Sequence, residues 1–227
     1  MNNVSLKGCI YTLIGVSAVA FFTLAKLQGL DISKAINFFS LLPKVISLDL
    51  LLAGFFIKWG WQLPVFKHWL VKFPNLKGTW VGEIHSNWIN PETNEATPPI
   101  PVMLTINQSF FHISCVMYTK EMKSYSSVEG FNIDADRQLK QLSYIYTSNP
   151  RNKFSKRSSP HDGTAVFDIM ISSNKLNGKY WTERRTHGEM YLRFYKKKLL
   201  EEIPFGYEKH PVSENLKTET VRPKIKR

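Results

Sequence analysis

The sequence predicts a helical membrane hairpin followed by an all-β domain that closes as an eight-stranded antiparallel barrel. Two observations predict the hairpin: an uncharged apolar stretch over residues 8–25, and a second apolar stretch between Lys44 and Lys58. One observation predicts the barrel: from about residue 76, apolar and polar residues alternate over short runs separated by turn residues. The expected domains are therefore residues 1–75, 76–198 and a tail from 199 to 227.

The first apolar stretch is expected to span a bilayer over about residues 8–25. Its 18 uncharged residues cover roughly 27 Å at about 1.5 Å per residue, close to a hydrocarbon core of about 30 Å. A cleaved signal peptide is the alternative, with Ala18-Val19-Ala20 as a small-residue cleavage site. The apolar run continues through Leu24, which favours a retained helix.

The second stretch predicts a span over about residues 41–59. Pro43 is expected in the first helical turn, where its missing N–H is not needed. The uninterrupted apolar run covers only residues 45–57, so a soluble amphipathic helix is the alternative. Trp59 and Trp61 follow this run, as in the aromatic belt of a membrane interface.

The distribution of charge predicts which side of the membrane the domain occupies. Lysines follow the second span closely without a nearby acid: Lys58, Lys67, Lys72 and Lys77. This bias favours a cytoplasmic C-terminal domain. Residues 1–57 hold four basic and two acidic residues and the remainder holds 26 and 16, so the domain carries most of the net charge of +12. A basic domain attracts lipid headgroups or nucleotide phosphates.

Eight runs are expected as strands because turn residues such as Asn149-Pro150 separate them. They cover residues 78–86, 102–107, 110–118, 124–131, 139–148, 163–172, 176–186 and 188–195. Short, evenly spaced strands with almost no helical period indicate a closed barrel. The lumen of an eight-stranded barrel is filled by side chains or holds one small ligand.

Alternation along the strands predicts which side chains face the lumen. Two apolar faces are expected inside: Val102, Leu104 and Ile106, and Met190, Leu192 and Phe194. Two other faces are polar and aromatic: Leu142, Tyr144, Tyr146 and Ser148, and Gly178, Tyr180, Thr182 and Arg184. Aromatic rings stack on nucleobases, and a guanidinium group binds phosphate. Tyrosines at a barrel rim and an Arg184 paired with a surface acid are the ordinary alternative.

Two further segments contain candidate ligand contacts. Residues 151–157 form a basic loop with one aromatic residue, which can close over a phosphate, touch headgroups or simply be solvated. His161 precedes the turn signal Asp162-Gly163 and is a candidate ligand contact or a plain loop residue. The six histidines and two cysteines show no metal-ligand spacing, and no catalytic motif stands out. Neither catalysis nor a cofactor is therefore expected.

Four sequence strings, in this order behind a helical hairpin, resemble one bacterial family. They are residues 76–82, residues 142–146 with Asn149-Pro150, residues 161–165, and residues 176–184 with Gly188. The family is the two-transmembrane β-barrel effectors of cyclic-oligonucleotide-based antiphage signalling systems (CBASS), called S-2TM-beta. The resemblance covers about residues 8–195. The Gly78-x-Trp80 start is also similar to lipocalins, but those are secreted and lack the hairpin.

The resemblance implies a membrane effector whose lipocalin-like barrel binds a cyclic dinucleotide made by a partner cyclic-nucleotide synthase. Binding then drives oligomerisation, and the helices disrupt the inner membrane so that the infected cell dies before phage matures. No DNA or RNA polymer is expected as a partner. The matching positions that become ligand candidates are Tyr144, Tyr146, Tyr180, Thr182 and Arg184, followed by Arg185 and His161.

Asp49 is the one acid inside the second span, where a carboxylate is costly and marks a functional position. We expect it at helix–helix contacts of the oligomer or lining a wet membrane lesion. Two other function classes stay open: a membrane-anchored lipocalin-like carrier with an apolar lumen, and a structural scaffold with a filled barrel. The tail over residues 199–227 is rich in Pro, Lys and Glu, a composition typical of disorder.

Overall fold

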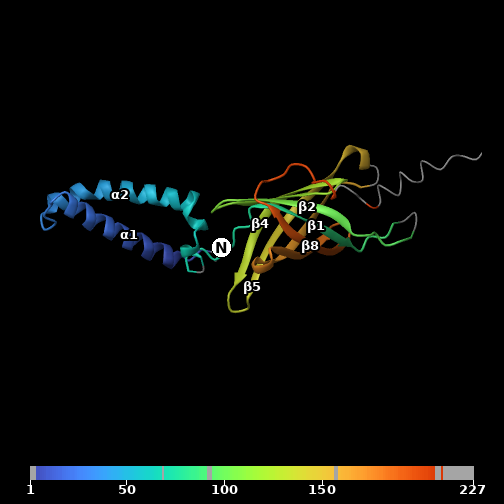
Figure 1. The fold of residues 1–227 in the computed structure, drawn as a ribbon, viewed down its shortest axis with the longest axis horizontal. Helices are drawn as coiled ribbons and strands as arrows, with labels where there is room; N and C mark the ends of the chain where they lie inside the picture. Colours follow the sequence, from blue (N-terminus) through green and yellow to red (C-terminus); the bar gives the residue numbers. More distant parts are fainter. Residues whose placement is uncertain (1–3, 68, 91–93, 156–157, 208–210, 212–227) are drawn as a thin grey trace, which may run out of the picture. The chain divides into compact units, whose positions relative to one another are not determined.

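The computed structural model describes residues 4–67, 69–90, 94–155, 158–207 and 211. The chain divides into two compact units, Met1–Asn75 and Leu76–Arg227. The first unit is built on two helices, α1 (Leu6–Leu27) and α2 (Ala35–Lys58), which form a hairpin (Figure 1). Both are long and apolar enough to cross a membrane, and most of their residues are exposed, unlike those of a soluble core helix.

Helix α2 begins at Ala35, six residues before the predicted start, so Pro43 lies inside the helix and not in its first turn. Proline has no N–H, and the carbonyl four residues earlier therefore lacks its usual helical partner. The flanking residues Leu41 and Val45 are both buried. Membrane helices tolerate such an interior proline because neighbouring groups compensate for the lost hydrogen bond.

The segment after α2 folds into two short 3₁₀ turns, η1 (Gly60–Gln62) and η2 (Pro64–Phe66). Trp61 is buried and packs on Phe73 with ring centroids 5.6 Å apart, so it does not belong to an exposed belt. Trp59 is exposed as expected, and the Lys58 Nζ lies 4.3 Å from its ring centroid. The Ser5 N–H donates to the Leu70 carbonyl at 3.2 Å, which ties the start of α1 to the segment after α2.

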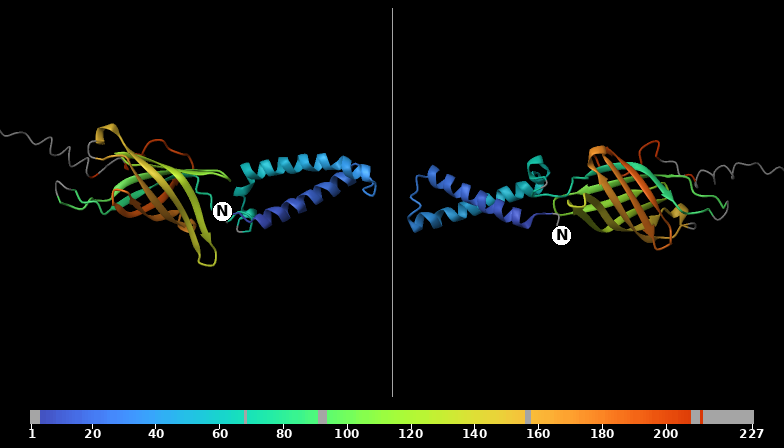
Figure 2. Two further views of the ribbon diagram at one scale, coloured as in Figure 1. Left: turned by 180° about the vertical axis from the view of Figure 1, so that it is seen from behind. Right: turned by 90° about the horizontal axis from the view of Figure 1, so that it is seen from below.

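The second unit is a closed barrel of eight antiparallel strands, which confirms the predicted fold class (Figures 1 and 2). The strands are β1 (Gly78–Ser86), β2 (Ile100–Gln108), β3 (Ile113–Tyr118), β4 (Met122–Asp134), β5 (Leu139–Pro150), β6 (His161–Met170), β7 (Lys175–Thr182) and β8 (His187–Lys196). Each strand pairs with the next along the chain, and β1 pairs with β8 to close the barrel.

The two ends of the barrel differ, and we name them by their connections. The entry end is where β1 begins, and it also holds the turns over residues 109–112, 135–138 and 171–174. The mouth end holds the connections over residues 87–99, 119–121, 151–160 and 183–186. The second view in Figure 2 shows the strands from the side, running between these ends.

Apolar side chains fill the lumen toward the entry end. The predicted inward faces of β2 and β8 are confirmed, since Leu104, Ile106 and Leu192 belong to one core cluster with Trp80 and Phe167. The bottom of this core is closed by polar contacts of Leu76. Its N–H donates to the Gln108 Oε1 at 2.7 Å, and its carbonyl accepts from the Trp80 indole at 3.0 Å.

Several strand boundaries were predicted wrongly. Strand β6 begins at His161, so the turn predicted at Asp162-Gly163 is part of a strand, and the 3₁₀ turn over Ile171–Ser173 ends that strand at Met170 and not at 172. Turns also interrupt two other predicted strands. Strand β3 begins at Ile113 and not at 110, since the Ser109 N–H donates to the His112 carbonyl at 2.8 Å and closes a turn. Strand β7 ends at Thr182 and not at 186. The Thr182 N–H donates to the Thr186 carbonyl, and Arg185 adopts a left-handed φ of 62°. Arg184 and Arg185 therefore lie in the β7–β8 turn.

The described start of the predicted tail packs on the outside of the barrel. We call residues 199–207 the strap. Its apolar side chains Leu200, Ile203 and Tyr207 contact an outer cluster of Val81, Met103 and Tyr118. Thr79 holds its start, because its hydroxyl donates to the Lys198 carbonyl at 2.7 Å and accepts from the Leu200 N–H at 3.0 Å. The remainder of the predicted tail, except residue 211, lies outside the described residues.

Candidate functional site

A cavity of about 190 Å³ opens at the mouth end, above the apolar core. We call it the mouth cavity. The structure brings six of the seven predicted ligand candidates into its lining, from three strands and one turn. These six residues are Tyr144, Tyr146, His161, Tyr180, Thr182 and Arg184.

Three tyrosines give the mouth cavity its aromatic wall. Tyr144 is the deepest, because it is fully enclosed and stacks on the core residue Phe167 with centroids 6.1 Å apart. Its hydroxyl is buried and has no hydrogen-bond partner among the described residues. The Tyr180 hydroxyl donates to the Ser86 Oγ at 2.8 Å. Burial raises the pKa of Tyr144, Tyr146 and Tyr180, so all three hydroxyls stay protonated and can donate.

Glycines opposite two of these tyrosines make room for their rings. A Cβ on Gly163 would lie 2.5 Å from the Tyr146 ring, and one on Gly188 would lie 3.0 Å from the Tyr180 ring and closer still to the His85 carbonyl. These short distances leave no space for a larger residue at either glycine position. Gly163, which lies in the 161–165 string, and Gly188 therefore shape the lumen.

Arg184 and His161 form a polar rim over the same cavity. The Arg184 guanidinium donates to the Ser158 Oγ at 2.8 Å and lies 3.4 Å from the His161 Nε2. The His161 Nδ1 lies 3.1 Å from the Ser159 carbonyl, which can only accept, so Nδ1 carries the proton. The Nε2 lone pair of a neutral ring then faces Arg184. Burial lowers the pKa of His161, and Arg184 lowers it further.

Arg185 and the basic loop lie apart from this arrangement. Arg185 is exposed in the β7–β8 turn and does not line the mouth cavity. In the loop over residues 151–157, Arg151 and Lys153 are exposed, and Arg151 donates its N–H to the Glu121 carbonyl at 2.8 Å. Lys156 and Arg157, which supplied half of the predicted basic charge there, lie outside the described residues.

Sequence reasoning missed several residues of the mouth cavity. Ser86 continues the inward face of β1 beyond Gly82 and Ile84, so alternation could have found it. Glu121 and Ser158 come from connections between strands, where alternation predicts nothing. The lining of the mouth cavity therefore contains an acidic side chain, Glu121, as well as the guanidinium group of Arg184. Among the described residues, no group of three or more His, Cys, Asp or Glu side chains could hold a metal ion.

The carboxylate of Asp49 is partly satisfied inside the helical hairpin. The Ser17 hydroxyl of α1 donates to the Asp49 Oδ2 at 2.6 Å. The Asp49 Oδ1 is buried and has no hydrogen-bond partner among the described residues. A buried acceptor without a partner costs free energy, so the Asp49 carboxylate destabilises the hairpin.

Two comparisons with known proteins bear on the barrel. The family model of the "Cap15, cyclic dinucleotide receptor domain" matches residues 71–193, which is more than half of the chain. A curated relative, CD-NTase-associated protein 15 of Staphylococcus schleiferi, is 28% identical over 95 residues. That match covers 42% of this chain and only 50% of the relative. By the match over residues 71–193, the chain belongs to the Cap15 cyclic dinucleotide receptor family, whose members are CBASS effectors.

Proposed function

We propose that this chain is a membrane-bound receptor that binds a cyclic dinucleotide in the mouth cavity and passes the signal to its helices. One observation carries the proposal. Stacking rings, protonated hydroxyl donors and a guanidinium group meet in one cavity of a cyclic dinucleotide receptor domain. These groups match the chemistry of a nucleotide, because aromatic rings stack on bases and Arg binds phosphate oxygens.

The size of the mouth cavity suggests how the ligand lies. Its volume of about 190 Å³ is below the roughly 300–1,000 Å³ of typical small-molecule pockets. One base would enter between the tyrosines, where the Tyr144 hydroxyl offers an unused donor. A phosphate would stay at the rim beside Arg184. His161 has one ring nitrogen on the Ser159 carbonyl and the other toward Arg184, which suits a binding role better than proton transfer to a substrate.

The proposed output is disruption of the inner membrane. The barrel would lie in the cytoplasm, where a cyclic-nucleotide synthase supplies the ligand after phage infection. Binding would favour a self-associating state, which requires that the ligand bind this state more tightly than the resting one. Clustered hairpins, with Asp49 at their contacts, would then breach the bilayer and kill the infected cell.

The same cavity weighs against the two alternatives. A carrier of apolar ligands would need an apolar lumen, but three tyrosines, His161 and Arg184 surround this one. A purely structural scaffold would need a filled barrel, but here a cavity of about 190 Å³ opens above the apolar core.

Titration calorimetry on the full-length protein in detergent tests the proposal. We expect heat with at least one member of a cyclic dinucleotide panel and none with fatty acids. Arg184→Gln should weaken binding about 10–100-fold, because it removes a charge-assisted contact. Arg185→Gln is the matched control, since it removes the same charge one residue away and outside the cavity. Absence of heat with every cyclic dinucleotide, or equal losses in the two variants, would contradict the proposal.

A further inference from the structure

The entry end of the barrel carries an exposed aromatic tip that the proposed function does not use. Phe111, in the turn between β2 and β3, is 77% exposed. Its ring meets that of Phe110 edge-on, with centroids 4.9 Å apart. The turn is held by the backbone bond from Ser109 to His112 and by the Ser109 Oγ, which accepts from the His112 N–H at 3.1 Å. A ring this exposed on a fixed turn gains nothing from the barrel itself.

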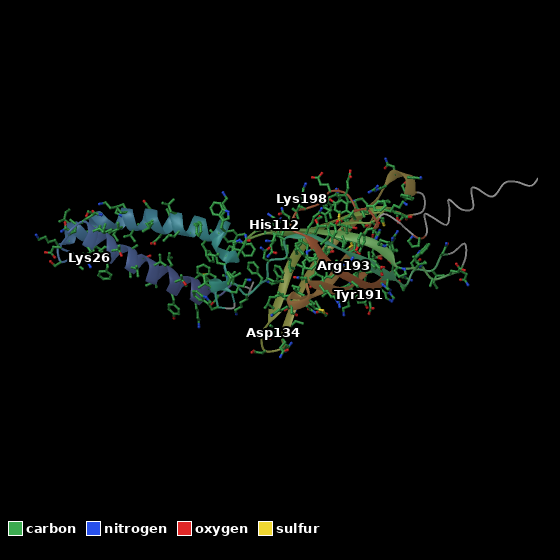
Figure 3. All side chains as sticks on the ribbon, in the orientation of Figure 1. Lys26, His112, Asp134, Tyr191, Arg193 and Lys198 are labelled. Carbon is green, nitrogen blue, oxygen red and sulfur yellow. The ribbon has the colours of Figure 1, made fainter. Side chains whose placement is uncertain are left out.

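A second turn adds apolar surface at the same end. Met170 at the end of β6 is 41% exposed, and Ile171 just after it is 53% exposed. The strand register places this turn at the entry end together with the Phe111 turn and the β4–β5 turn. Figure 3 labels His112 and Asp134 next to two of these turns. These exposed apolar side chains, on separate turns at one end of the barrel, are available to a surface that covers that end.

The same end is strongly basic. Its exposed lysines are Lys77, Lys140, Lys175, Lys196, Lys197 and Lys198. Asp134, at the end of β4, is paired with Arg137 at 3.6 Å, and Asp136 lies in the turn that follows. The entry end therefore presents exposed apolar side chains together with exposed lysines.

We propose that the entry end docks on the surface of an anionic lipid bilayer, with Phe111 in the headgroup region. Aromatic side chains favour the membrane–water interface, and lysines near it are attracted to anionic lipids. Continuity of the chain supports this occupant, because β1 begins at the entry end only a few residues after the unit that holds both candidate spans. Docking would leave the mouth cavity open to dissolved ligand.

An environment-sensitive fluorophore tests the docking on the full-length chain in nanodiscs. In a Cys9→Ala background, the dye is attached at Phe111→Cys or at the control Ala96→Cys, an exposed position at the mouth end. The remaining Cys115 is buried. In nanodiscs with phosphatidylglycerol, we expect a blue shift and loss of iodide quenching at position 111 but not at 96. A shift of the same size in purely zwitterionic nanodiscs would overturn the role of the lysines.

A second measurement keeps the native phenylalanine. Hydrogen exchange over residues 109–112 should be slower in anionic nanodiscs than in detergent, and Phe111→Ser should remove that difference. The variant's thermal midpoint should match the parent's because Phe111 is exposed. Equal solvent access at positions 111 and 96, or unchanged exchange in Phe111→Ser, would overturn the docking. None of these readouts needs a cyclic dinucleotide, so they separate this inference from the proposed function.

Discussion

At the scale of single residues, Tyr144 gives a prediction in which stability and binding change in opposite directions. Its buried hydroxyl has no partner among the described residues, and such a group costs about 1–3 kcal/mol. Tyr144→Phe should therefore stabilise the unliganded protein by up to about 1 kcal/mol and weaken ligand binding about 2–10-fold. Denaturant unfolding and calorimetry measure the two effects.

Tyr180→Phe is the control for that experiment. The Tyr180 hydroxyl already bonds the Ser86 Oγ, so its removal should destabilise the unliganded protein by about 1 kcal/mol. If both variants lost stability alike, the Tyr144 hydroxyl would have a partner in the unliganded protein, and its role as a free donor would be excluded.

His161 predicts how ligand affinity depends on pH. Its pKa in the folded protein is lowered by burial and by Arg184, against the opposing carboxylates of Glu183 and Asp162. Below a pH of about 6.5 the unfolded chain therefore binds a proton that the folded chain lacks, and stability falls as pH falls. A phosphate at the rim would favour the imidazolium and raise this pKa.

Affinity for a cyclic dinucleotide should therefore rise as pH falls from 8 to 6, by at most about tenfold per pH unit for one proton. Calorimetry in two buffers of different ionisation enthalpy measures the proton uptake directly. His161→Gln should abolish the uptake. Affinity that is constant or falls toward pH 6 would place the phosphate away from His161.

At the scale of elements, the packing of the strap on the barrel leads to a prediction about stability that does not follow from composition alone. Ile203 packs on the outer cluster, whereas Phe205 two residues later is 95% exposed. Ile203→Ala should destabilise the protein by about 1–2 kcal/mol because it removes partly buried methylenes. Phe205→Ala should change stability by less than about 0.5 kcal/mol. Thermal unfolding compares them, and equal effects would mean that the strap is not held on the barrel.

Sequence periodicity predicted the elements well where alternation governs them and failed where single contacts do. The inward faces of β2 and β8 follow from a period of two, and β1 was predicted with its observed bounds. Arg184 was assigned to a strand face, but it reaches the mouth cavity from a turn through Ser158, a residue far away in sequence. Such long-range contacts leave no periodic signal in either segment.

The helices show the same limit. The length of the apolar stretches predicted two spans. The prediction that Pro43 lies in the first turn of the second helix was wrong, because helix continuity across a proline depends on the packing around it. The pairing of Ser17 with Asp49 joins residues 32 apart in the chain, and no local pattern predicts it.

At the scale of the whole molecule, the proposed function predicts that detection and membrane damage can be separated by mutation. Arg184 lines the mouth cavity, and Asp49 lies in the hairpin. Arg184→Gln should lose binding, ligand-induced assembly and dye leakage from liposomes together. Asp49→Leu should bind the ligand as tightly as the parent but leak far less, because the Asp49 Oδ1, which has no partner in the lone hairpin among the described residues, would gain one or meet water in the assembly.

Sedimentation in detergent, calorimetry and dye leakage on the same preparations measure the three steps. Leu50→Ala is the control for the hairpin, since Leu50 is exposed and adjacent to Asp49 but has no polar group. It should leave leakage close to that of the parent. Unchanged leakage in Asp49→Leu would remove the carboxylate from the output step. In a receptor-gated assembly, ligand binding must precede membrane damage. If Arg184→Gln still caused leakage although it no longer binds the ligand, the helices would act independently of the barrel.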